Sequence, residues 1–191
     1  MIRSLLPLLL LLLLLAAACT EKETPGPTPA GAFASLYTLS SSGTPRQIGD
    51  ARFEREGNLV RLTIELYTLT PGSRHALHLH EGSCEDPGMH WNGGSSEKYC
   101  TIPSMGTPWG RPYLGDIGNI EIGSDGKGSL SLQTDLWALG DGSALDVMGK
   151  VLMVHAEPED FALECDPNHT NHPHTNPKIA CGQVFKRVRM P

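Results

Sequence analysis

An alternation of apolar and polar residues with a period of two is the feature that most restricts the fold. Residues 57–69, "GNLVRLTIELYTL", place Val60, Leu62, Ile64 and Leu66 on one face of an extended segment and mainly polar side chains on the other. This period is typical of a half-buried β-strand. No part of the globular sequence keeps an apolar period of 3.6 residues, and 21 glycines and 15 prolines accompany the short apolar segments. We therefore predict an all-β fold, an antiparallel sandwich or barrel.

Three further segments fit this pattern. Residues 71–80, "PGSRHALHLH", form a strand after a Pro-Gly turn, and residues 117–136 contain two short strands around a hairpin loop, "SDGKG". Residues 149–157, "GKVLMVHAE", form a compact apolar strand. Two stretches, residues 83–113 and 157–178, are instead rich in Gly, Pro, Asn, Asp and His. Loops of this length in a compact domain are usually functional or disordered, and we expect two long functional loops here.

The N-terminal segment has the composition of an export signal. Residues 1–18 contain one arginine, an unbroken leucine run and three alanines, and the run is shorter than the roughly 20 residues of a membrane span. Cys19 follows directly and resembles the lipidated cysteine of bacterial lipoproteins; a plain signal peptide with an incidental cysteine is the alternative. Residues 19–31 are a Pro/Thr-rich tether, and residues 32–191 form the folded domain. We expect a membrane-anchored lipoprotein that faces the periplasm or the extracellular side.

Charge and cysteine content narrow the class of protein. The formal net charge is −6 and becomes −7 when the signal and its arginine are removed, and no basic run is present. This argues against a nucleic-acid partner. Export implies an oxidising compartment in which disulfides persist. With Cys19 assigned to lipid, four cysteines remain and allow three pairings, among which the residues themselves do not choose. They are Cys84, Cys100, Cys165 and Cys181.

Closely spaced histidines are the strongest chemical signal. His78 and His80 lie two residues apart, so on a strand they point to the same face about 6–7 Å apart and can converge on one ion. His75 has the opposite parity and should point away. A histidine on a strand is usually an ordinary residue. This pair lies in an exported β-domain with more histidines downstream, which favours a metal site.

Several motifs together resemble one family. They are "LTPGSRHALHLHEGSC", "MHWN", "YLGDIGNIEIGSDGKGSL", "LMVHAEPEDF" and "KIACGQV". Their order and spacing resemble those of the copper/zinc superoxide dismutases, in their exported bacterial form, over about residues 33–186. The resemblance implies a Greek-key β-sandwich of about eight antiparallel strands. It also implies disproportionation of superoxide to dioxygen and hydrogen peroxide by a copper that cycles between two oxidation states.

The resemblance also assigns roles to individual residues. His78, His80 and His155 match copper ligands, and His90 matches the histidine that bridges copper and zinc and carries protons during turnover. Lys178 stands where the family has an arginine that attracts the anion; lysine keeps the charge but loses the forked donor geometry. Imidazole ligands suit copper, whereas zinc has no redox chemistry.

The same comparison selects one cysteine pairing. Cys84 and Cys181 match the family disulfide, which leaves Cys100 with Cys165. We hypothesise that this second disulfide pins the two long loops together. Closing a loop of about 65 residues contributes roughly 4 kcal/mol to the free energy of unfolding in the chain-entropy model, less any strain.

The expected zinc site is incomplete. Asp116 matches the zinc-binding aspartate of the family, but Tyr113 and a position near Lys98 stand where two histidines are expected. A structural zinc site normally needs four ligands. We therefore predict that copper is the only metal and that Asp116 is a remnant of the zinc site.

Other polar residues near the site have competing interpretations. His169, His172 and His174 belong to a solvated loop, capture copper, or rebuild a zinc site with Asp116 and His90. We assign His75 a structural role with a hydrogen bond to backbone. Glu159 and Asp160 are candidates for orienting the ligands.

Three functions remain after the sequence is considered. The favoured one is a superoxide dismutase that uses copper alone, with superoxide as its substrate. The main alternative is a lipoprotein of similar fold that binds or delivers copper with little turnover. A structural or adhesive β-sandwich would leave four correctly placed histidines unexplained.

Overall fold

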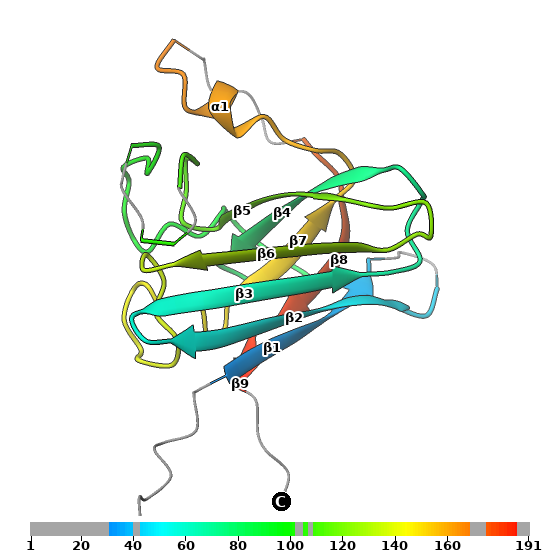
Figure 1. Cartoon of the computed structure of the whole chain (residues 1–191), viewed down its shortest axis with the longest axis horizontal. Helices are drawn as coiled ribbons and strands as arrows, with labels where there is room; N and C mark the ends of the chain where they lie inside the picture. Colours follow the sequence, from blue (N-terminus) through cyan, green and yellow to red (C-terminus); the bar gives the residue numbers. More distant parts are fainter. Residues whose placement is uncertain (1–30, 40–42, 102–104, 107–108, 169–174, 187–191) are drawn as a thin grey trace, which may run out of the picture.

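The computed structural model describes residues 31–39, 43–101, 105–106, 109–168 and 175–186. Its strands form one antiparallel sheet that curls into a nearly closed barrel (Figure 1). The prediction of an all-β fold is confirmed. The strands are β1 Gly31–Thr38, β2 Gln47–Glu56, β3 Leu59–Leu66, β4 Arg74–His80, β5 Asp116–Glu121, β6 Gly128–Thr134, β7 Val151–His155, β8 Lys178–Gln183 and β9 Phe185–Lys186. One short helix is described, α1 Phe161–Glu164.

The order of the strands shows Greek-key crossovers. Along the sheet the order is β5-β4-β7-β8-β1-β2-β3-β6, with β9 beside β1. The first three strands are neighbours in sequence and in space. The chain then crosses the barrel from β3 to β4, and again from β6 to β7. These crossovers place β4 beside β7, which brings segments about 75 residues apart into contact.

The predicted hairpin over residues 117–136 is only partly present. Its loop forms a tight turn in which Gly123 N–H donates to the Lys127 carbonyl at 2.7 Å. The two strands do not share a ladder, however, because β5 pairs with β4 and β6 pairs with β3. They approach closely at the turn, where a Cβ at Gly128 would lie 2.6 Å from the Glu121 carbonyl oxygen. The turn therefore spans the seam at which the barrel closes.

Burial follows the alternation seen in the sequence. Val60, Leu62, Ile64 and Leu66 of β3 are all at most 3 % exposed. In β7 all five residues are buried, because both faces of this strand are covered. One face joins the main core. The other packs against Cys181 of β8 and Cys84 of the loop that follows β4. This explains why β7 has a continuous apolar sequence instead of an alternating one.

Two disulfides fix the long loops. Cys84–Cys181 ties the loop after β4 to β8, and Cys100–Cys165 joins that loop to the one after β7. Both pairings agree with the expectation from the family resemblance. Beside the second disulfide, Lys98 Nζ donates to the Glu164 carbonyl at 2.6 Å. The loop with α1 lies at the end of the molecule opposite to β9 and the start of β1 (Figure 1).

No helix among the described residues is long and apolar enough to cross a membrane. The predicted signal segment, Cys19 and the tether up to residue 30 lie outside the described residues, and so do His169, His172 and His174.

Candidate metal centre

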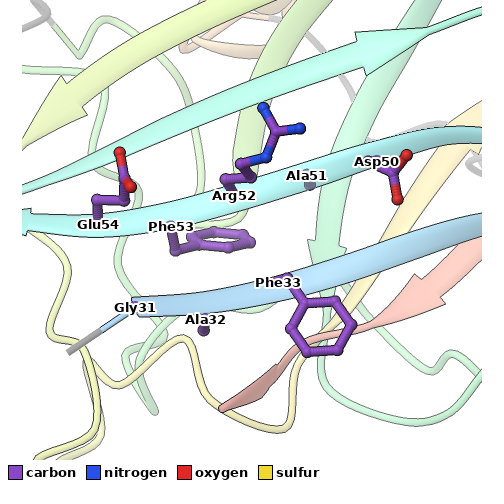
Figure 2. A pocket seen from close by; sticks show the side chains of 8 residues that line it. All are labelled: Gly31, Ala32, Phe33, Asp50, Ala51, Arg52, Phe53 and Glu54. Atoms are coloured by element: carbon purple, nitrogen blue, oxygen red, sulfur yellow. The ribbon is translucent and has the colours of Figure 1, made fainter. Parts of the chain in front are cut away.

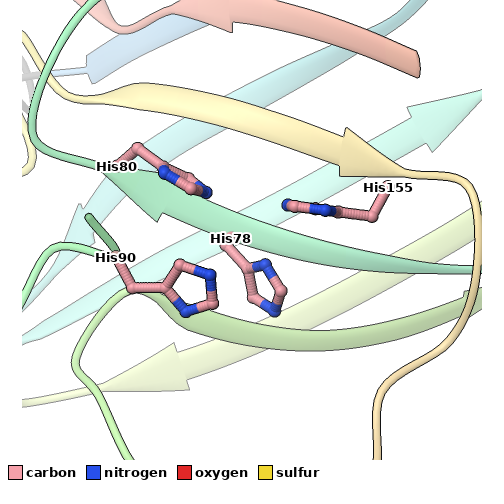
Figure 3. Close-up of side chains that lie close together, drawn as sticks. All are labelled: His78, His80, His90 and His155. Carbon is pink, nitrogen blue, oxygen red and sulfur yellow. The ribbon is translucent and has the colours of Figure 1, made fainter. Parts of the chain in front are cut away.

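Four histidines from three parts of the chain converge at one point. His78 and His80 come from β4, His90 from the loop after it and His155 from the end of β7, and one ring nitrogen of each lies within 4.8 Å of the others. Figure 3 shows the four rings facing a common centre. No second group of three or more converging His, Cys, Asp or Glu side chains occurs in the described ranges.

Backbone pairing explains how a loop residue joins this cluster. Beside His80, the loop takes the place that β5 would occupy, and a bridge forms between His80 and His90. Trp91 N–H donates to the Leu79 carbonyl at 2.8 Å, and Glu81 N–H donates to the Met89 carbonyl at 3.1 Å. The Trp91 side chain is fully buried and holds this segment in place. His90 is therefore placed by a short extension of the sheet.

His75 takes no part in the cluster, as its parity predicts. Its Nδ1 lies 2.8 Å from the His155 carbonyl oxygen, and its Nε2 lies 2.7 Å from Ser73 Oγ. This histidine braces the backbone of a cluster member, which agrees with the structural role expected from the sequence.

Hydrogen bonds orient two of the rings. Nδ1 of His80 lies 3.1 Å from the Gly88 carbonyl, and Nδ1 of His155 lies 3.0 Å from the Asn176 carbonyl. A carbonyl only accepts, so each Nδ1 carries the proton and each Nε2 has a lone pair. Both Nε2 atoms are buried and have no hydrogen-bond partner among the described residues. A buried acceptor without a partner costs about 1–3 kcal/mol, so these atoms fit a bound cation.

The protonation state of the same two residues favours metal binding. Burial lowers the pKa of His80 to about 3, with a further contribution from the positive charge of His90. Burial lowers the pKa of His155 to about 4, although the hydrogen bond to Asn176 opposes this shift. Both imidazoles are therefore neutral at pH 7, which is the form that binds a metal.

Carboxylates contact the other two rings. His78 Nε2 lies 2.5 Å from Glu159 Oε2, and His90 Nδ1 lies 2.9 Å from Asp116 Oδ1. A carboxylate beside one ring nitrogen favours a proton on that nitrogen, which fixes the tautomer and makes the other nitrogen a better ligand. Nδ1 of His78 and Nε2 of His90 are then the nitrogens that would bind the metal. Glu159 thus contacts a candidate ligand, whereas the Asp160 side chain instead caps α1 by accepting from Ala162 and Leu163 N–H.

The region expected to hold zinc is filled in another way. The Asp116 side chain, 1 % exposed, also accepts from Tyr113 N–H through Oδ2 at 2.7 Å. The Tyr113 ring packs edge-on against His90 with centroids 5.9 Å apart. Burial raises the pKa of the Tyr113 phenol, and the negative charge of Asp116 raises it further. This phenol therefore stays protonated at neutral pH and is a poor metal ligand.

Lys178 supplies positive charge close to the cluster. It begins β8 and is the ladder partner of His155. Its charge is among the causes that lower the pKa of His80 and His155. The His90 side chain is 9 % exposed, against 1 % for His78, so solvent reaches the cluster more readily at His90.

The carbonyl acceptors that orient His80 and His155 could not be predicted from the sequence. Both belong to loop backbone, at Gly88 and Asn176, and a backbone carbonyl leaves no signature in the residue type.

A surface hollow over the β1–β2 pairing, lined by Phe33, Arg52 and their neighbours, shares no residue with the cluster (Figure 2). We assign no chemistry to it.

Comparison with known proteins agrees with this geometry. The family model "Copper/zinc superoxide dismutase (SODC)" matches residues 47–184. A superoxide dismutase [Cu-Zn] of Mycolicibacterium paratuberculosis is 28 % identical over 155 residues, which cover 73 % of this chain and 67 % of the relative. The superoxide dismutase-like protein YojM of Bacillus subtilis is 26 % identical over 136 residues, which cover 69 % of this chain and 66 % of that protein.

A solved structure supports the fold independently. The crystal structure of a single-site mutant of a superoxide dismutase-like protein from Bacillus subtilis aligns with a TM-score of 0.60 at 21 % identity. The alignment covers 80 % of this chain and 97 % of that structure. The match of the family model extends from β2 to the end of β8 and contains all four converging histidines. The chain therefore belongs to the copper/zinc superoxide dismutase family.

Proposed function

We propose that this protein is a superoxide dismutase that uses copper as its only metal. The observation that carries the proposal is the buried cluster of four histidines in which His80 and His155 direct unpartnered Nε2 atoms inward. An all-imidazole donor set suits copper, and bound copper would supply the one-electron redox chemistry that disproportionation requires. His78, His80, His90 and His155 would hold it.

His90 is the residue best placed to handle a proton. Its Nδ1 contacts the Asp116 carboxylate, and its ring is the more exposed to solvent of the two carboxylate-bound histidines. A proton taken up at Nε2 would form an imidazolium, which Asp116 stabilises through its negative charge. His90 can thus accept a proton from solvent and release it toward the product peroxide.

Lys178 would attract the substrate anion. A positive charge near a buried site raises the local concentration of a small anion and its rate of encounter. The lysine ammonium is a point charge and lacks the planar guanidinium group with which arginine donates two parallel hydrogen bonds. We expect attraction of superoxide to be retained and its positioning to be weaker than with arginine.

The assignment of copper alone rests on the filled zinc region. Asp116 already bonds His90 and Tyr113 N–H. Tyr113 and a position near Lys98 stand where the family has two histidine ligands. The two loops that a zinc ion would organise are held by the Cys100–Cys165 disulfide and by the bond from Lys98 to Glu164. These contacts make a second metal unnecessary for order in the loops.

A protein that binds or delivers copper with little turnover is the second candidate. It is favoured by Lys178 in place of arginine and by similarity to a relative named only "superoxide dismutase-like". For either function we propose export and lipid anchoring at Cys19. Two disulfides support an oxidising compartment, and the composition of residues 1–18 supports a signal.

Metal analysis combined with superoxide turnover tests the proposal. The purified domain is loaded with copper and zinc, metal content is measured, and superoxide decay is followed by stopped flow. We expect one copper, no zinc and rapid turnover, and we expect His155→Ala to lose both copper and activity while remaining folded. One copper with negligible turnover would favour the second candidate, and one tightly bound zinc would refute the assignment of copper alone.

A further inference from the structure

An asparagine on β5 holds the loop that follows β7. Asn119 Nδ2 donates to the Glu159 carbonyl at 2.8 Å, and Asn119 Oδ1 accepts from Glu159 N–H at 2.9 Å. A carboxamide presents one donor face and one acceptor, so it can pair with a peptide as a neighbouring strand would. Glu159 lies outside any strand or helix. Asn119 thus provides the backbone pairing that a ladder would otherwise supply.

Glu159 is the residue whose carboxylate contacts His78. Its Oε2 lies 2.5 Å from His78 Nε2, and the two side chains are 16 % and 1 % exposed. With both backbone groups fixed by Asn119, only the side-chain torsions of Glu159 remain to be set. The contact with His78 is therefore anchored to β5 through a short, rigid path.

The neighbouring backbone is fixed on the other side. Glu157 N–H donates to Asn176 Oδ1 at 3.0 Å, and Asn176 Nδ2 donates to the Glu157 carbonyl at 2.8 Å. Ala76 N–H, from the ladder partner of Asn119, also donates to the Glu157 carbonyl. Two asparagines thus clamp the segment 157–159 at both ends, although only Asn119 bonds the residue that contacts His78.

We propose that Asn119 is a positioning residue of the candidate copper site, which acts on His78 through Glu159. The proposal rests on the proposed function, because it takes His78 as a metal ligand. Loss of the Asn119 carboxamide leaves the backbone of Glu159 without these two bonds, so the loop shifts and the carboxylate leaves His78 Nε2. The ring then loses its fixed tautomer, and Nδ1 binds metal less well.

A double-mutant cycle tests this path. Asn119→Ala, Glu159→Ala and the double variant are compared for Cu(II) affinity by competition with a chelator and for their Cu(II) EPR spectra. We expect each single variant to bind copper about tenfold more weakly with altered EPR parameters. Because Asn119 acts only through Glu159, the double variant should match Glu159→Ala. Additive losses, or unchanged affinity in Asn119→Ala, would overturn the proposal.

Two control variants distinguish a positioning role of Asn119 from a general loss of stability. Asn168→Ala removes an exposed asparagine whose carboxamide bonds Asp166, and it should leave affinity unchanged. Asn119→Asp keeps an oxygen that can accept from Glu159 N–H, and it should bind copper more tightly than Asn119→Ala. If Asn119→Ala fails to fold, the cycle is run with Asn119→Asp.

A measurement on the metal-free protein tests the role of Asn119 separately from the proposed function. In the apoprotein, ¹⁵N chemical shifts of the His78 ring should report a single tautomer, protonated at Nε2, in the wild type and a mixture in Asn119→Ala. An unchanged His78 tautomer would refute the inference even if copper binds. Failure of the wild type to bind copper would instead refute the proposed function, and the tautomer shift would still be measurable.

Discussion

At the scale of single residues, position along β4 decides what each histidine does. His78 and His80 point into the cluster, whereas His75 bonds the His155 carbonyl and Ser73. All three are buried. Burial therefore does not distinguish a candidate ligand from a structural histidine, but strand parity does.

This difference can be measured with matched substitutions. His75→Leu removes the donor to the His155 carbonyl, so the apoprotein should lose about 1–3 kcal/mol of unfolding free energy in urea denaturation. Its copper stoichiometry should stay at one. His78→Leu is the matched variant, and it should lose copper with a smaller loss of stability. Loss of copper by the His75 variant at full folding would contradict the structural role.

At the scale of loops and strands, covalent and polar links replace regular secondary structure. The loop after β4 and the loop after β7 meet at Cys100–Cys165, close to the bond from Lys98 to Glu164. Only one short helix, α1, is described within them. Their order therefore depends on a few links, each of which can be removed.

The contribution of the second disulfide follows from the length of chain it closes. Cys100 and Cys165 are 65 residues apart, so replacing both by serine should lower the free energy of unfolding by about 4 kcal/mol at most. Guanidinium denaturation of the oxidised proteins measures this loss. Equal midpoints for wild type and variant would show that the link does not stabilise the fold.

A third loop, between β6 and β7, is organised by the carboxylate of Asp146. Asp146 accepts from the N–H groups of Gly140, Gly142 and Met148 at 2.8–2.9 Å. Burial alone would raise the pKa of this carboxyl, but these hydrogen bonds together hold it below its ordinary value. The folded state therefore binds a proton less readily than the unfolded chain.

The pH dependence of stability follows from the sign of that shift. A lowered pKa in the folded state contributes stability above the unfolded value, and this contribution is lost as pH falls through the folded pKa. Asp146→Asn should cost about 1–3 kcal/mol at pH 7. The difference from wild type should shrink as the pH falls below about 4. Thermal unfolding of both proteins between pH 3 and pH 7 checks this, and a difference independent of pH would contradict it.

At the scale of the whole molecule, the net charge is opposite in sign to the charge of Lys178 beside the cluster. The chain carries a formal net charge of −6, yet Lys178 lies close enough to the cluster to lower the pKa of His80 and His155. An anionic substrate would be repelled by the net charge of the molecule and attracted by Lys178. Salt screens both effects over about 10 Å at 0.1 M.

Kinetics at two salt concentrations separate the effect of the Lys178 charge from that of the net charge. Lys178→Gln should lower kcat/KM for superoxide several-fold at low ionic strength and by less at high ionic strength, because screening already removes part of the attraction. Lys178→Arg should keep the wild-type salt dependence. Lys127→Gln, an exposed lysine on the turn after β5, serves as the control. Equal losses for Lys178→Gln and Lys127→Gln would show that only total charge matters.

The features of this protein that the sequence determined by itself follow from local patterns of residues along the strands. The period of two fixes which residues of β3 face the core and which residues of β4 share a face, since neighbouring side chains on a strand must point to opposite faces. It therefore separated His75 from His78 and His80 and predicted an all-β fold. The family motifs then added His90, His155 and the Cys84–Cys181 pairing, which spacing by itself left open.

Only the tertiary structure decided which distant groups meet. Three sets of contacts show this: the ladder partners of β5 and β6, the carbonyls at Gly88 and Asn176, and the clamp from Asn119 to Glu159. Each joins segments remote in sequence or uses backbone atoms. Such contacts depend on barrel closure and on loop paths, and neither residue type nor local period encodes them. The sequence therefore identified the candidate ligands, and the fold determined how they are oriented.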